Sequence, residues 1–279
     1  MNKDQLTSRI HALSKESGAS FNAILTLYFL ESILRRITAS DQKDTFIFKG
    51  GFLLASSLGL AIRTTKDIDL HLQGISLDPI SLENNLQNIL RLDLNDQIQY
   101  EILGLDPIRE TDPYGGIRCK IVCKFENIKQ TVSIDFATGD PITPGAIRYP
   151  YKTLFSQETL SILSYNLETI LAEKLHTVVC RGIANSRSKD FYDIYTIVKL
   201  KSDQIDRNYL KIALQRTFEY RKSLFENEQI LKLLIEIKED QLINTRWNAY
   251  VNHNSFAEGI QFRDTIQACL DLLEMINND

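Results

Sequence analysis

The chain has 279 residues, of which 43% are hydrophobic and 24% are charged, a balance typical of soluble globular proteins with one large or two smaller domains. The formal net charge of -4 argues against broad nonspecific adhesion to nucleic acid, although it leaves room for a local basic groove. No apolar run is long enough to span a bilayer, and the first ten residues lack the apolar core of a signal peptide, so we expect a cytoplasmic protein with no membrane partner.

The first part of the chain alternates between helical and strand patterns. Two helices come first, with Ser20 as the expected N-cap of the second. A short strand then leads into Gly50-Gly51, and the helix that follows is expected to end at Gly59. In chain order the predicted elements are helices 4–16 and 20–38, a strand at 45–49, a helix to residue 58, a strand through residue 72 and a helix at 79–92.

Strand patterns continue in the middle of the chain and then give way to helices. Alternating segments lie at 97–104, 115–125 and 130–137, and a turn at 126–129 is expected to join the last two as a hairpin. After Pro150 strand signals fade, apart from a short one near 160–163. The predicted helices beyond it are 167–180, 188–200, 207–220, 227–237 and 255–276.

These patterns predict an α+β (mixed α/β) fold, with a mixed sheet, flanking helices and a C-terminal helical domain. The expected divisions are N-terminal helices over 1–40 that pack on the core, a sheet domain over 41–155, and a helical domain over 156–279.

The most informative segment reads KGGFLLASSLGLAIRTTKDIDL, in which Asp67 and Asp69 follow Gly50-Gly51. Side chains of a strand alternate between its two faces, so both carboxylates point the same way, with their Cβ atoms roughly 6.5 Å apart. A carboxylate pair at that spacing can hold hard divalent cations. Free backbone N–H groups at a glycine turn that starts a helix suit phosphate. Together these features indicate chemistry on a nucleotide with a bound metal ion.

Asp135, in the segment TVSIDFATGDPITP, is a third candidate carboxylate. Alternation turns its apolar neighbours toward the core and Asp135 toward the other face. If this strand lies beside the strand of the aspartate pair, Asp67, Asp69 and Asp135 align and a two-metal site becomes available. Taken alone, Asp135 is better interpreted as the end of a strand, and the upstream pair is what favours the metal interpretation.

A second charged constellation lies in the helical half, within LETILAEKLHTVVCRGIANSRSKDFYDIY. Lys174 sits on a helix with an apolar face, and its compact ammonium suits a phosphate. Arg187 adds positive charge, and Asp190 and Asp193 stand three residues apart on one helical face. The alternative is a solvated surface helix with salt bridges, which the density of charge around a single turn makes less attractive.

Other sites and chemistries are weaker. Arg63 is left open between a phosphate contact, an ion pair with the first aspartate, and exposure to solvent. The sequence contains no GxSxG elbow, Walker A motif or GxGxxG fingerprint. No disulfides are expected, and Cys119 and Cys123 are predicted to face the core from a strand. His71 is expected to pack or lie at the surface, and His176 is assigned no role.

These residues resemble a known superfamily. The order of Gly50-Gly51, a short helix, the aspartate pair and a later-strand Asp135 resembles the nucleotidyltransferase signature of the polymerase-beta-like fold. More closely, RTTKDIDL, AEKLHTVVCRG and RSKDFYD resemble the AbiEii toxin family, the nucleotidyltransferase-like toxins of type IV toxin–antitoxin systems. The resemblance spans roughly residues 45–200 and implies a nucleotidyltransferase-like sheet.

The resemblance implies roles residue by residue. Asp67 and Asp69 match the metal-binding pair, and Gly50-Gly51 match the phosphate-binding turn. Lys174 matches a lysine expected to bind nucleotide phosphate. A further essential aspartate matches either Asp190 or Asp193, with Asp190 ranked first because of the preceding lysine. The catalytic set is thus Asp67, Asp69, Lys174 and Asp190, the nucleotide-binding set Gly50, Gly51, Arg63, Lys174, Arg187 and Asp193, and the metal set Asp67, Asp69 and Asp135.

The implied activity is a Mg2+-dependent transfer of a nucleotide from an NTP to an acceptor, a reaction of the EC 2.7.7 type. The resemblance implies the 3′ end of tRNA as the acceptor, a consequent block of translation and growth, and neutralisation by a cognate antitoxin. The donor NTP and the oligomeric state stay undefined.

Three alternatives stay open at the level of sequence. One is transfer to a small molecule or protein, and another is a binding module that keeps the fold without the activity. The third is an antitoxin or DNA-binding partner, which the scattered basic residues of the first 38 positions do not favour.

Overall fold

The computed structural model of the chain describes residues 1–63, 65, 67–74, 77–108 and 115–277. The chain divides into two compact units, which are treated separately below. Unit 1 comprises Met1–Gly139 and Ile147–Ser164, and unit 2 comprises Asp140–Ala146 and Tyr165–Asp279. The predicted domain boundaries stay predictions.

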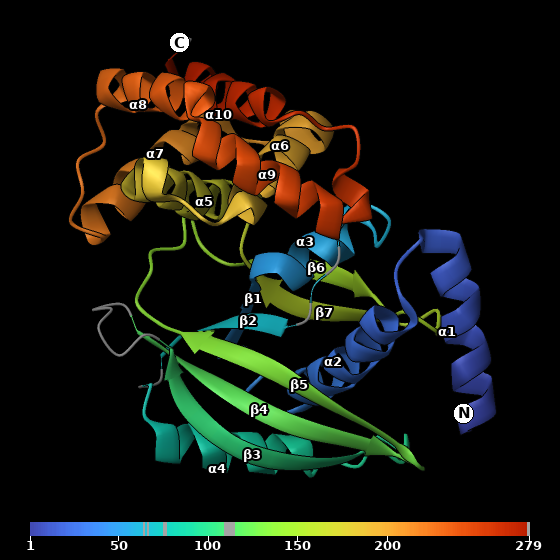
Figure 1. The fold of residues 1–279 in the computed structure, drawn as a ribbon. Helices are drawn as coiled ribbons and strands as arrows, with labels where there is room; N and C mark the ends of the chain where they lie inside the picture. The colour runs from blue at the N-terminus through green and yellow to red at the C-terminus, as the bar shows by residue number, and fades with distance from the viewer. Residues whose placement is uncertain (64, 66, 75–76, 109–114, 278–279) are drawn as a thin grey trace. The chain divides into compact units, whose positions relative to one another are not determined.

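Unit 1 is a mixed sheet with helices packed on it (Figure 1). Its elements are α1 (Lys3–Ser17), α2 (Phe21–Ala39), β1 (Phe46–Lys49), α3 (Gly50–Leu58), β2 (Asp67–Leu72), α4 (Pro79–Leu90), β3 (Gln99–Ile108), β4 (Gly116–Phe125), β5 (Ile128–Ala137), β6 (Ile147–Lys152) and β7 (Thr159–Ser164). The expected N-cap of α2 is confirmed, since the Ser20 side chain accepts a hydrogen bond from the backbone of Ala23. Pro79 takes the first turn of α4, where its missing N–H costs nothing.

Within the described residues the sheet has seven strands, in the order β3-β4-β5-β2-β1-β7-β6. The pairs β2–β5 and β1–β7 are parallel, and the other neighbours are antiparallel. The predicted α+β class with a mixed sheet is therefore confirmed.

The two central strands β2 and β5 have one apolar and one polar face. Ile68, Leu70, Val132, Ile134 and Phe136 are buried, at 2% exposure or less. Helix α2 packs on β5 on this apolar side. The alternate positions of both strands carry the half-buried aspartates, so period-2 alternation separates the core from a polar face within a single pair of strands.

Unit 2 is helical. Its elements are α5 (Leu167–Arg181), α6 (Ser188–Lys201), α7 (Arg207–Tyr220), α8 (Asn227–Glu239), α9 (Gln241–His253) and α10 (Phe262–Asn277), with short 3-10 turns at Gly182–Ala184, Ser202–Gln204 and Ser255–Ala257. Helix α5 packs against α6 and α7, and α10 packs against α6 and α8. The segment Asp140–Ala146 is fastened to this unit because the Asn166 side chain donates to the carbonyl of Thr143 at 2.6 Å.

The sequence prediction was wrong at two elements. Strand β6 was missed, because Pro150 lies within it and proline is usually read as a strand breaker. The topology explains its presence, since β6 is an edge strand, where proline is tolerated. Helix α9 was also missed, and the single helix expected at 255–276 begins only at Phe262, after Gly259 adopts a φ of +80°.

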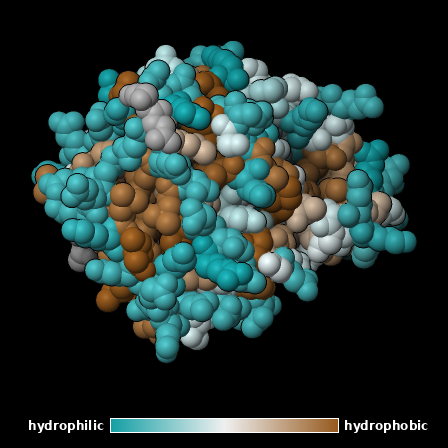
Figure 2. Space-filling model, turned by 90° about the horizontal axis from the view of Figure 1, so that it is seen from above, coloured by the Kyte–Doolittle hydropathy of each residue, from teal (hydrophilic) through white to brown (hydrophobic). Residues whose placement is uncertain are grey.

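The surface is mostly hydrophilic where Figure 2 displays it, with hydrophobic residues exposed in several places between the polar ones. In unit 2 the most exposed large apolar side chains include Leu224, Ile183, Ile235 and Leu242. Among the described residues, no helix by itself has the length and apolar character needed to cross a membrane, and α1 with α2 meets the test only as a pair bent by 117°.

Candidate functional site

The parallel pairing of β2 and β5 brings the three sheet aspartates to one face of unit 1. Asp69 lies opposite Asp135 in the ladder, and Asp67 lies opposite Ser133. The condition set by the sequence analysis, that these two strands be neighbours, is therefore met. All three aspartates are half-buried rather than fully buried.

The loop around the glycine pair explains why small residues are required there. Gly50 has a φ of +69°, a conformation that residues with a side chain avoid. A Cβ atom at this position would also lie only 1.9 Å from Oδ2 of Asp69. The backbone N–H of Gly51 donates to the same oxygen at 3.3 Å. The carboxylate of Asp69 thus packs directly against the glycine turn.

Two further residues border the turn. A Cβ atom at Gly51 would lie 3.1 Å from Oγ1 of Thr65 and 3.2 Å from Nη2 of Arg63. Both side chains belong to buried residues, at 8% exposure each. Of the three options that the sequence left open for Arg63, full exposure to solvent is therefore wrong. A phosphate contact remains a prediction.

Thr65 was missed by the sequence analysis. Its hydroxyl donates to Oδ1 of Asp67 at 3.0 Å, which fixes the orientation of the first aspartate. A threonine two positions before a candidate metal ligand, on the same side of an extended chain, is the signal that would have identified it.

Arg118 on β4 was also missed. Its Nε and Nη2 donate to the two carboxylate oxygens of Asp135 at 2.7 and 2.6 Å, and Nη2 lies 3.8 Å from Oδ2 of Asp67. Hydrogen bonding to Asp135 raises the pKa of the Arg118 guanidinium further above its usual range, so this side chain stays charged. The polar face therefore contains its own cation.

The predicted length of the hairpin turn was wrong, and the register that it implies does not place Arg118 beside Asp135. In the structure Phe125 pairs with Ile128, so only Glu126 and Asn127 form the turn, and Arg118 falls opposite Asp135. The predicted turn at 126–129 would instead have placed Arg118 opposite Ala137. A two-residue change in loop length shifts every cross-strand pair in the hairpin.

The oxygen donors of Asp67 and Asp69 fit a hard divalent cation such as Mg2+ in chemistry. Both lie on one face of β2, and Asp69 packs against the glycine turn. Asp135 differs because both of its oxygens are engaged by Arg118. Across the part of the chain that the structure describes, no three His, Cys, Asp or Glu side chains form a group that could hold a metal ion. The predicted metal set stays a prediction.

The second predicted constellation is assembled within unit 2. Nζ of Lys174 on α5 lies 3.1 Å from Oδ1 of Asp190 and 2.6 Å from Oδ2 of Asp193, both on α6. Arg187 reaches Oδ2 of Asp190 at 2.8 Å. The side chains of Asp193 and Asp190 are 0% and 2% exposed and that of Lys174 is 12% exposed, so the alternative of a solvated surface helix is wrong.

The structure also shows where the cysteines and two of the histidines lie. Cys119 and Cys123 are fully buried, as predicted, and the four cysteines are free thiols. His71 is buried at 6% exposure. His176, which was given no role, packs against Phe218 and lies beside Arg221, and burial lowers its pKa to about 4.

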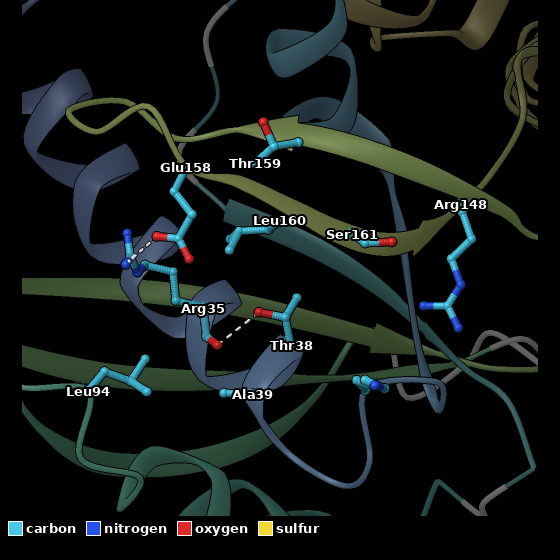
Figure 3. Close-up of a pocket in the computed structure, with 10 residues that line it drawn as sticks. Arg35, Thr38, Ala39, Leu94, Arg148, Glu158, Thr159, Leu160 and Ser161 are labelled. Carbon is cyan, nitrogen blue, oxygen red and sulfur yellow. Dashed lines mark hydrogen bonds and ion pairs between the residues drawn. The ribbon is translucent and has the colours of Figure 1, made fainter.

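A pocket of about 550 Å³ lies elsewhere in unit 1. Its wall includes Arg35 and Thr38 of α2, Arg148 of β6, and the stretch from Glu158 to Ser161 (Figure 3). Arg35 and Glu158 form an ion pair of 2.5 Å at its edge. The residues that line it do not include the predicted site residues.

A comparison with models of protein families finds one that matches this chain. The family model described as "Nucleotidyl transferase AbiEii toxin, Type IV TA system" matches residues 32–270, most of the chain. None of the curated proteins matches this chain.

Two solved structures from Helicobacter pylori are similar to it. A candidate nucleotidyltransferase shows 14% sequence identity and a TM-score of 0.49, over 92% of this chain and 96% of its own. The protein JHP933 shows 14% identity and a TM-score of 0.48, over 92% of each chain. Similarity at this level adds nothing to the functional assignment.

Proposed function

The chain belongs to the AbiEii family of nucleotidyl transferase toxins from type IV toxin–antitoxin systems, and on that premise we propose that it transfers a nucleotide from an NTP to the 3′ end of a tRNA. The resemblance stated from the sequence is thereby confirmed at the level of the family. The donor NTP, the tRNA acceptor and the Mg2+ requirement belong to the proposal.

The reaction is an in-line displacement at the α-phosphate. The acceptor hydroxyl gives its proton to solvent water and attacks the α-phosphorus, the bond from that phosphorus to the bridging oxygen breaks, and pyrophosphate leaves with the electron pair of that bond. Mg2+ bound at this centre would neutralise the triphosphate and make the acceptor hydroxyl more acidic.

The observation that carries the proposal is the contact of Asp69 with the glycine turn. Asp67 and Asp69 share a half-buried face, and the backbone of Gly51 donates to Asp69. Carboxylates that would hold Mg2+ thus lie beside the start of α3, where backbone N–H groups and the helix dipole favour phosphate. Arg63, beside Gly51, supplies positive charge at the same turn.

The remaining roles are those that the resemblance stated from the sequence implies. Lys174 and Arg187 are assigned to nucleotide phosphate, and Asp190 with Asp193 keeps the lysine in place and charged. Their mutual distances support this division, since both carboxylates contact the ammonium of Lys174. We assign the reaction to the cytoplasm and expect a cognate antitoxin to bind the protein.

The test is end-labelling of total cellular RNA with each of the four labelled NTPs in turn, with Mg2+ or with EDTA. We expect one NTP to label the tRNA fraction, and we expect Asp69→Ala and EDTA each to reduce labelling to background. Asp106→Ala is the matched control, because Asp106 is an exposed β3 aspartate paired with Lys120 and should leave labelling unchanged.

Each other outcome has a defined meaning. Label in an RNA other than tRNA would replace tRNA by that RNA as the acceptor. The proposal would be refuted if the wild type and Asp69→Ala labelled RNA equally, or if neither labelled it.

A further inference from the structure

The cation within the aspartate face makes two hydrogen bonds to one carboxylate. Arg118 makes a two-point contact with Asp135, with donor–acceptor distances of 2.7 and 2.6 Å. A planar guanidinium matched to both oxygens of a carboxylate is among the strongest charge-assisted contacts in proteins. Because arginine stays charged at any physiological pH, its positive charge is a permanent part of this face.

The consequence for Asp135 is that each of its oxygens already accepts an N–H of a positively charged group. Its side chain is 16% exposed, and its open side is covered by a guanidinium that is itself 41% exposed. A divalent ion bound to the remaining lone pairs of Asp135 would lie close to the Arg118 guanidinium, and the two positive charges would repel each other. Asp67 is under no such restriction, because Arg118 approaches it only to 3.8 Å.

The charge balance of the aspartate face also favours Arg118 over a second metal ion beside Asp135. Three carboxylates on adjacent strands repel one another, and one fixed positive charge between Asp67 and Asp135 relieves that repulsion without a metal. In a two-metal site a second ion would perform this task. Here a side chain from the neighbouring strand β4 occupies that place.

We propose that Arg118 is a built-in substitute for a second metal ion: it withholds Asp135 from metal binding and leaves Asp67 and Asp69 to bind one divalent cation. This inference rests on the proposed function and changes the metal set expected from the sequence. Asp135 becomes the anchor of Arg118, and Arg118 becomes a positioning residue that keeps positive charge beside Asp67.

The experiment is a Mn2+ titration of the full chain without nucleotide, followed by electron paramagnetic resonance of the free ion. The variants are Arg118→Met, Asp135→Asn and their combination, with Asp67→Asn to establish the site. Lys120→Met is the matched control, because Lys120 lies two residues along β4 and its exposed ion pair is with Asp106.

We expect the wild type to bind one ion, Asp67→Asn to abolish that binding, and Asp135→Asn to leave the affinity within about twofold. Arg118→Met should release Asp135, so that binding tightens about tenfold or a second ion appears. The combined variant should lose that gain, and Lys120→Met should match the wild type.

Two results would overturn the inference. If Asp135→Asn binds Mn2+ about tenfold more weakly than the wild type, Asp135 is a metal ligand. This result is informative even if Arg118→Met fails to fold. Unchanged binding in a folded Arg118→Met would also refute it, although in both cases the nucleotidyltransferase proposal would survive. If the wild type binds no Mn2+, the single-metal inference is refuted and the Mg2+ requirement of the proposed reaction loses its support. The RNA labelling experiment then tests nucleotide transfer independently.

Discussion

Asp69 fills the space that a side chain at Gly50 would need, with Oδ2 lying 1.9 Å from where a Cβ atom would be. Oδ2 is also the oxygen that accepts the Gly51 backbone N–H. Asp69 can therefore take this position only because residue 50 has no side chain. Any residue other than glycine at position 50 must displace the carboxylate or the turn.

Gly50→Ala should abolish nucleotide transfer and weaken Mn2+ binding, because the new methyl group displaces Asp69. Gly18→Ala is the matched control, since Gly18 has a similar φ of +73° and no atom within 4 Å of its would-be Cβ. Both variants lose about 1–2 kcal/mol of folding free energy to the left-handed conformation. Chemical denaturation and labelling assays should separate them, and equal activity in the two variants would contradict the role given to Gly50.

Thr65→Val should lower metal affinity and transfer rate about tenfold, because the hydroxyl that orients Asp67 is lost while the side-chain shape is kept. Thr138→Val is a suitable control, because that hydroxyl donates to the backbone carbonyl of Leu72 at 3.2 Å. The measurements are Mn2+ titration and single-turnover transfer. A Thr65→Val protein with wild-type values in both would show that Asp67 needs no such support.

Lys174→Met should destabilise unit 2 by about 3–5 kcal/mol, because it leaves the buried carboxylates of Asp190 and Asp193 without their shared ammonium. Adding Asp193→Asn should restore part of this loss, since one of the two buried negative charges is removed. Lys199→Met, at an exposed position on α6, serves as the control. Urea denaturation followed by far-UV circular dichroism is the readout, and an unchanged midpoint in Lys174→Met would refute the burial argument.

Glu31 gives unit 1 a dependence on pH. The carboxyl is 4% exposed and accepts hydrogen bonds from the Tyr151 hydroxyl and the Leu154 backbone. Burial raises the pKa of Glu31 from 4.5 to about 7, against the opposing effect of those hydrogen bonds and of Arg35. The folded state therefore keeps its proton at pH values where the unfolded chain has lost it.

Stability should thus fall as the pH rises from about 4.5 to about 7, by about 1.4 kcal/mol per unit and roughly 3 kcal/mol in all. Glu31→Gln should remove that dependence while keeping an acceptor for Tyr151. Glu158→Gln, at the exposed partner of Arg35, should retain it. Denaturation at pH 5 and pH 8 measures the difference, and parallel pH profiles for wild type and Glu31→Gln would contradict it.

The faces on which the three sheet aspartates lie could be predicted from the sequence, because they depend only on the neighbouring residues along each strand. Alternation along β2 places Asp67 and Asp69 on one face, and the apolar partners of Asp135 place it on the corresponding face of β5. The three-residue spacing of Asp190 and Asp193 likewise settles their common helical face. These inferences need only the period of the element.

What the sequence could not provide depends on partners far along the chain. Arg118 meets Asp135 only when the hairpin register is known to the residue, and the burial of Lys174 depends on how α5 packs on α6. Strand β6 is stable despite Pro150 because the topology places it at the edge. Local periodicity carries none of this information.

The chain leaves unit 1 after Gly139 and returns at Ile147 to supply β6 and β7 before leaving again after Ser164. Strand β7 is the parallel neighbour of β1, which runs straight into the glycine turn. While the ribosome is still synthesising the residues before Ser164, β1 has one open edge and the turn has incomplete support. The strand that covers this edge of β1 is therefore synthesised about a hundred residues after the glycine turn, so the turn gains its full support only once Ser164 has been added.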